Sequence, residues 1–134
     1  MKSAAIAIVI FAVAGLIIYN FLSNSNQQMD KQIDITPAEF GEMIKSSSGV
    51  VIDVRTDDEY QNGHLSLASH QYDLLNGEFK AQLDSLDKDK TYYLYCRSGN
   101  RSGQAARLMK KNGFENVYNV GGFEELAAEG FETQ

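Results

Sequence analysis

The chain's single cysteine, Cys96, lies in a context from which its chemistry can be inferred. It follows an apolar run at 92–95, which predicts a strand, and it precedes a helical pattern over 104–111. At the start of a helix, unpaired backbone N–H groups and the helix dipole both favour negative charge. This position predicts a stabilised thiolate, which is the nucleophilic form of cysteine.

The residues after the cysteine are polar and basic, and they form the sequence Arg97-Ser98-Gly99-Asn100-Arg101-Ser102. The two arginines add full positive charge beside the thiol, and the glycine permits a tight curl of the backbone. Ser102 can cap the following helix. We interpret residues 97–102 as candidate substrate-binding residues around a catalytic Cys96. The alternatives are a buried structural cysteine and ordinary exposed arginines.

Three further motifs accompany this loop in the sequence. They are Val51-Ile52-Asp53-Val54-Arg55, Gly63-His64-Leu65 and Gly121-Gly122. Together with the loop they resemble the rhodanese (thiosulfate sulfurtransferase) family, in matching order over residues 35–131. The resemblance implies an α/β fold with five strands and the active loop at their C-terminal edge. The glycine pair should let the chain turn tightly close to that loop.

The predicted supporting residues of the site are Asp53, Arg55, Glu59 and His64. The resemblance implies this role for Asp53 and Arg55 and matches His64 to the family's Gly-His position, and direct chemistry is the alternative for Asp53, Arg55 and Glu59. Arg55 is expected to pair with a nearby acid, and Glu59 is the candidate by spacing. His64 is expected to make structural hydrogen bonds, with a general-base role as the alternative. The chain departs from the family at 63–68, where the common proline and glycine are missing, so the local turn is expected to differ.

The alternation of apolar strands with helical patterns predicts a mostly parallel sheet with helices on both faces. Strands are expected at 33–35, 50–54, 69–72, 91–95 and 115–120. Thr36 and Pro37 mark a helix start, with Glu39 closing a capping box. Thr56 can cap a second, short helix over 57–61, and a closing helix is expected over 123–129.

The first 22 residues predict a transmembrane signal anchor, because residues 3–22 are almost entirely apolar and long enough to span a bilayer. A cleavable signal peptide is the main alternative, and a buried soluble helix is a weaker one. Residues 23–32 are expected to form a flexible polar linker, and residues 33–134 the rhodanese-like domain. Lys2 precedes the span, so the positive-inside rule places the domain outside the inner (cytoplasmic) membrane, in the periplasm of a bacterium.

Composition excludes several functions. The net charge of −6 argues against binding nucleic acid, which requires a basic face. One cysteine precludes an internal disulfide, and the two histidines and the cysteine have no metal-site spacing. Neither a metal nor an organic cofactor is implied, and the sequence identifies no protein partner.

The resemblance implies transfer of a sulfane sulfur from an anionic donor such as thiosulfate, through a Cys96 persulfide, to cyanide or a thiol. Two alternatives remain open at this point. A cysteine phosphatase or arsenate reductase also uses a thiolate in an N–H cradle, although the related phosphatases carry one more residue between cysteine and arginine than Cys96 and Arg101 allow. A membrane-tethered sulfur carrier or binding module would keep the loop without turning over a small donor.

Overall fold

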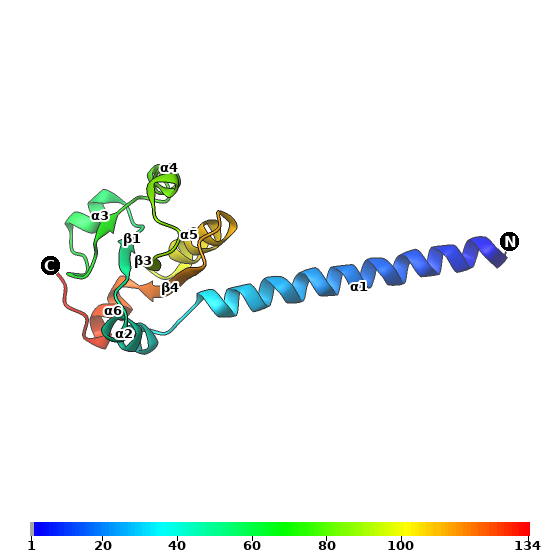
Figure 1. The fold of residues 1–134 in the computed structure, drawn as a ribbon, viewed down its shortest axis with the longest axis horizontal. Helices are drawn as coiled ribbons and strands as arrows, with labels where there is room; N and C mark the ends of the chain where they lie inside the picture. The colour runs from blue at the N-terminus through cyan, green and yellow to red at the C-terminus, as the bar shows by residue number, and fades with distance from the viewer. Residues whose placement is uncertain (1) are drawn as a thin grey trace. The chain divides into compact units, whose positions relative to one another are not determined.

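The structure is a computed structural model that describes residues 2–134, with side chains described for residues 8–25 and 33–134. The chain divides into two compact units, one ending at Lys31 and the other comprising Gln32–Gln134. Figure 1 shows the order of the helices and strands along the chain. The second unit carries the whole β-sheet.

Helix α1 runs over Lys2–Ile33 and is a candidate membrane span by length and composition. Its window Ile8–Ser25 has a mean hydropathy of 1.8, and none of the window is buried. The sequence predicted a flexible segment from residue 23, but the helix continues to Ile33. Its polar part is compatible with a helix because Gln, Met and Lys are good helix formers. The Ser25 hydroxyl finds a partner within the helix, the Phe21 carbonyl.

The sheet has four strands: β1 (Val50–Asp53), β2 (His70–Gln71), β3 (Thr91–Cys96) and β4 (Asn116–Gly122). Their order is β2-β1-β3-β4, and every neighbouring pair is parallel. The connecting helices are α2 (Pro37–Ser46), α3 (Asp57–Gln61), α4 (Glu78–Gln82), the 3-10 helix η1 (Leu83–Ser85), α5 (Asn100–Lys111) and α6 (Phe123–Glu129). The predicted parallel α/β fold is therefore confirmed.

The fifth strand expected over 33–35 is reduced to a single bridge between Asp34 and Asn119. The Ile35 N–H donates to the Asn119 carbonyl at 3.1 Å. Helix α1 ends at Ile33 and Thr36 is the N-cap of α2, so only Asp34 and Ile35 lie between the end of α1 and that cap. A strand has no room to extend there, and the sheet has four strands instead of five.

Helices cover both faces of the sheet, as expected (Figure 1). One face carries a core under α2 and α6 made of Phe40, Val51, Leu65, Tyr93, Tyr95, Val120 and Leu126. On the other face α5 lies against β3 and β4 and buries Ala105, Ala106 and Met109. Strand side chains alternate between the two faces, so the apolar strands β1 and β3 supply both cores.

The capping sites predicted at Thr36 and Thr56 are confirmed. Thr36 accepts the Glu39 N–H while the Glu39 carboxylate accepts the Thr36 N–H, which completes a capping box. Thr56 and Glu59 make the same reciprocal pair at the start of α3. The second box also fixes the carboxylate of Glu59, which faces the site described next.

Candidate active site

Cys96 is the last residue of β3 and is fully buried. The chain then turns through the Cys96 loop, residues 96–102, in which Gly99 has a φ of 88°. Its Sγ accepts the Gly99 N–H at 3.1 Å and lies 3.4 Å from the Ser102 hydroxyl oxygen. Helix α5 begins at Asn100, so the thiol lies at the N-terminal end of a 12-residue helix.

Two opposing effects set the pKa of the Cys96 thiol. Burial raises this pKa, because it disfavours the charged thiolate. Hydrogen bonds from the Ser102 hydroxyl and from the backbone N–H groups of Ser102, Ser98 and Gly99 lower it. The hydrogen bonds outweigh burial, and the pKa lies below the ordinary value for a thiol. The site therefore favours the nucleophilic form of the cysteine.

Ser102 differs from its expected role. The N-cap of α5 is Gly99, which makes no side-chain capping bond, and Ser102 is buried in the first turn of the helix. Its hydroxyl lies 2.6 Å from Asn119 Oδ1 as well as near Cys96 Sγ. The prediction that Ser102 caps the helix is wrong, because its side chain points toward the thiol and β4.

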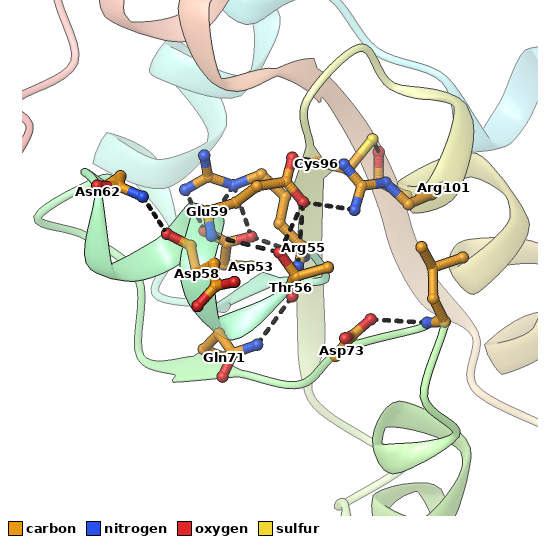
Figure 2. A network of polar contacts seen from close by, with 12 residues as sticks. Asp53, Arg55, Thr56, Asp58, Glu59, Asn62, Gln71, Asp73, Cys96 and Arg101 are labelled. Carbon is orange, nitrogen blue, oxygen red and sulfur yellow. Dashed lines mark hydrogen bonds and ion pairs between the residues drawn. The ribbon is translucent and has the colours of Figure 1, made fainter.

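Arg101 makes a bidentate ion pair with Glu59, with 2.7 Å between the nitrogen and oxygen atoms of each bond (Figure 2). The Arg101 guanidinium holds the pKa of Glu59 down at about 2. The pair joins the Cys96 loop, which contains Arg101, to α3, which contains Glu59. The capping box at Thr56 also holds the Glu59 carboxylate in place. Two of the guanidinium nitrogens expected to face a donor anion are bonded to protein.

Arg55 pairs with Asp53, so the predicted Arg55–Glu59 pair is wrong. The Arg55–Asp53 bridge is 2.6 Å long and is almost completely buried. Arg55 also donates to the Gly63 carbonyl at 2.7 Å, and its guanidinium lies 4.4 Å from the centre of the Phe123 ring. This cluster ties β1 to the turn at Gly63 and to α6.

His64 lies at the end of the turn after α3. Its Nδ1 is 3.0 Å from the Tyr60 carbonyl, so this nitrogen carries the proton and donates. The two rings stack with centroids 3.7 Å apart. The backbone of His64 exchanges two hydrogen bonds of 2.9 Å with Gln134, which closes the C-terminal tail on this turn.

The remaining residues of the Cys96 loop reach solvent. Arg97, Ser98 and Asn100 are exposed, and Asn100 accepts a 2.7 Å bond from the side chain of Gln104. The expected approach of Gly121-Gly122 to this loop is confirmed. A Cβ on Gly122 would lie 2.5 Å from the Arg97 carbonyl oxygen, and a Cβ on Gly99 would lie 3.4 Å from the Gly121 Cα.

Sequence reasoning missed Asn119, which lies in β4 beside the loop. Its Nδ2 donates to Asp34 Oδ1 at 2.7 Å and to the Gly99 carbonyl at 3.0 Å. Its Oδ1 contacts the Ser102 hydroxyl at 2.6 Å and the Gly121 N–H at 3.3 Å. The only sequence signal was its place two residues before the glycine pair, near the carboxyl end of a strand.

The parallel sheet, the thiol at the start of α5 and the loop that encloses it form one arrangement, in which a buried cysteine at the carboxyl end of a strand faces the first turn of a helix. Residues 36–129 match the rhodanese-like domain family, and the chain belongs to that family. The match begins at the N-cap of α2 and ends with α6, so it covers the sheet and the whole site.

Individual proteins show the same relationship. The chain is 34% identical over 119 residues to the Bacillus subtilis "Uncharacterized protein YqhL", covering 88% of this chain and 90% of the relative. It is 33% identical over 95 residues to the Coxiella burnetii "Thiosulfate sulfurtransferase GlpE", covering 70% and 86%. The structure is similar to that of a rhodanese-like domain protein from Staphylococcus aureus, with a TM-score of 0.62, 30% identity, and coverage of 75% and 96%.

Proposed function

We propose that the chain is a sulfurtransferase that moves a sulfane sulfur from an anionic donor such as thiosulfate, through Cys96, to a thiol or to cyanide. The observation that carries this proposal is the environment of Cys96 Sγ, which combines burial with hydrogen bonds from the loop that lower the thiol pKa. The similarity to a protein named as a thiosulfate sulfurtransferase supports the choice of reaction.

The reaction is a double displacement. The Cys96 thiolate attacks the outer sulfur of thiosulfate, the donor S–S bond breaks, and sulfite leaves with the bonding electron pair. A persulfide anion remains on Cys96. An acceptor thiolate or cyanide then attacks the outer persulfide sulfur. The bond between that sulfur and Cys96 Sγ breaks, and the Cys96 thiolate is restored. The N–H groups of the Cys96 loop stabilise the negative charge at both stages.

The two arginines of the loop take different parts in this scheme. Arg97 is exposed and is the residue that we assign to the donor's oxyanion. Arg101 contributes positive charge near the sulfur while it remains bonded to Glu59. Its main effect is to hold the loop against α3, so it positions the N–H groups that face the thiol.

The test is the intact mass of the full chain before and after incubation with thiosulfate. We expect a gain of one sulfur atom that cyanide removes and that a Cys96→Ser variant does not show. If the mass is unchanged while Cys96 still reacts readily with an alkylating agent, thiosulfate is the wrong donor. If the thiol is also inert, the sulfurtransferase proposal is wrong.

A sulfur carrier is the second candidate, and the Arg101–Glu59 pair favours it. Because two guanidinium nitrogens are bonded to protein, the site offers fewer donors to a small dianion than the sequence suggested. Such a site suits a persulfide delivered by another protein. A carrier would accept one sulfur per chain from a persulfide and show no multiple turnover with thiosulfate and cyanide.

We propose further that residues 1–22 anchor the chain, that 23–32 connect the anchor to the domain, and that 33–134 act outside the cytoplasmic membrane. The apolar window Ile8–Ser25 and the preceding Lys2 support this arrangement. A Cys96→Ser, Glu129→Cys variant supplies one exposed thiol. A membrane-impermeant maleimide should label it in intact cells, and labelling only after lysis would contradict this orientation.

A further inference from the structure

The Ser102 hydroxyl has two neighbours that can each accept its single proton. Asn119 Oδ1 lies 2.6 Å from its oxygen, and Cys96 Sγ lies 3.4 Å from it. A hydroxyl carries one donor hydrogen and accepts through its lone pairs. Ser102 can therefore donate to only one of these neighbours at a time.

The orientation of the Asn119 amide is fixed by its other partners. Its Nδ2 faces the Asp34 carboxylate and the Gly99 carbonyl, and these groups can only accept. Its Oδ1 faces the Gly121 N–H, which can only donate. The oxygen of Asn119 must therefore face Ser102, where it acts as an acceptor.

We propose that Asn119 is a positioning residue. Its Oδ1 accepts the hydrogen bond of the Ser102 hydroxyl while Cys96 is a thiol, and the hydroxyl redirects this hydrogen bond to Sγ when the thiolate forms. In the thiol state Ser102 donates to Asn119 and can accept the S–H of Cys96. When the thiol proton leaves to solvent, the hydroxyl turns toward the sulfur and makes a charge-assisted bond, which is the stronger of the two. Asn119 Oδ1 keeps its bond from the Gly121 N–H, so it is not left unsatisfied.

The charged groups around the thiol act on the same equilibrium. Arg101, from α5, favours the thiolate, while Glu59 on α3 and Asp73 after β2 face Arg101 and weaken its effect. Asp34 lies on the far side of Asn119 and holds the amide by its nitrogen. Arg97 is exposed at the start of the loop. None of these charged groups is a hydrogen-bond acceptor for the Ser102 hydroxyl. The competition between Asn119 Oδ1 and Cys96 Sγ for that hydroxyl can therefore be measured separately from their effect.

The role rests on the proposed use of Cys96 as the nucleophile, but its first test requires no sulfur donor. In the full chain in detergent micelles, the ¹³C shift of the Asn119 side-chain carbonyl is followed by NMR against pH. We expect it to titrate with the apparent pKa of the Cys96 thiol, and this titration should disappear in Ser102→Ala. The inference is overturned if the carbonyl chemical shift does not change as the thiol titrates, or if the same change persists in Ser102→Ala.

The second test is a double-mutant cycle on the thiol pKa, measured as the pH profile of alkylation by iodoacetamide. Ser102→Ala should raise the pKa by about one unit, and Asn119→Leu should lower it by about half a unit to one unit. Asn119→Leu should have no effect once Ser102 is alanine. An equal shift in both backgrounds would mean that Asn119 acts only by holding the Gly99 carbonyl, and the inference would be wrong.

These readouts separate the inference from the proposed function. If the chain shows both the carbonyl titration and the coupling, yet gains no sulfur from any donor, the switch of the Ser102 hydrogen bond stands and the sulfurtransferase assignment is wrong. A chain that transfers sulfur without coupling between Asn119 and Ser102 would retain the function and lose the inference.

Discussion

Tyr93 and Tyr95 lie on the same face of β3 and are both fully buried, but their hydroxyl groups differ. The Tyr95 oxygen accepts the Leu65 N–H at 3.1 Å. The Tyr93 hydroxyl is buried with no hydrogen-bond partner among the described residues. A buried polar group without a partner costs free energy that the same bonded group does not.

We therefore expect opposite results from Tyr93→Phe and Tyr95→Phe, measured by urea unfolding of the full chain in detergent. Tyr93→Phe should leave the free energy of unfolding unchanged or raise it. Tyr95→Phe should lower it by about 1–3 kcal/mol, because the Leu65 N–H loses its partner in the core. Equal losses in the two variants would show that the Tyr93 hydroxyl is bonded.

The Glu59–Arg101 pair should make the stability of the fold depend on pH. The pKa of Glu59 falls from an ordinary 4.5 to about 2. The stabilisation is therefore fully present above pH 4.5 and is lost as the pH falls toward 2. Glu59→Gln should be less stable than the unchanged chain at neutral pH. It should also lose less stability than the unchanged chain between pH 4.5 and about pH 2, as followed by thermal unfolding.

Glu42→Gln is the matched control for that measurement. Glu42 pairs with Lys45 at 3.6 Å, but both side chains are more than three-quarters exposed, at 82% and 76%. Exposed pairs of this kind contribute about 0–1 kcal/mol. A Glu42→Gln variant that flattens the pH profile as much as Glu59→Gln would show that the effect is general charge and not the Arg101 pair.

The sequence located the Cys96 loop because its signal is local, but it assigned the wrong partner to Arg55. The spacing of Arg55 and Glu59 fits a pair on one helix, yet Arg55 precedes Thr56, the N-cap of α3. Its side chain turns back toward Asp53 at the end of β1. Asn119 was missed because its partner Asp34 is 85 residues away, and only the folded sheet brings them together.

At the scale of elements, β4 and the Cys96 loop pack so closely that only glycine fits at Gly122. Its backbone is extended, with φ −102° and ψ 149°, so alanine would meet no conformational penalty. The obstacle is the Arg97 carbonyl oxygen, 2.5 Å from the Cβ that alanine would add. The restriction at Gly122 is therefore purely steric.

Gly122→Ala should displace the Arg97 carbonyl, slow alkylation of Cys96 and lower the free energy of unfolding by about 1–3 kcal/mol. The control is Gly41→Ala in α2, where the added Cβ would lie 3.6 Å from Phe131, an ordinary contact. This control should be neutral or stabilising, because alanine favours the helix over glycine. Unchanged alkylation in Gly122→Ala would show that the loop can move without affecting the thiol.

The sequence predicted most elements of the fold because their signals are local. The capping residues Thr36 and Thr56 and the apolar runs of β1 and β3 mark their own boundaries. The prediction of a strand over 33–35 was wrong because the residues left for that strand depend on where α1 ends, which the local pattern does not show. The helical extension of α1 into polar sequence carries no apolar period, so the pattern could not indicate it.

At the scale of the whole molecule, the proposed membrane anchor depends on the apolar part of α1. Val13 lies within the apolar window Ile8–Ser25, and its side chain is 51% exposed. Val13→Arg should weaken insertion by about 2.5–3.5 kcal/mol and move chain from the carbonate-washed membrane pellet to the supernatant. Asn24→Arg, near the polar end of the window, should stay in the pellet. Equal behaviour of the two variants would contradict a membrane-spanning α1.

The two edges of the sheet have a consequence for aggregation. β2 is two residues long, and the chain crosses the opposite edge at the bridge between Asp34 and Asn119. Free strand edges recruit the strands of other chains. An interrupted edge on each side leaves the backbone of other copies little to pair with, which disfavours edge-to-edge aggregation.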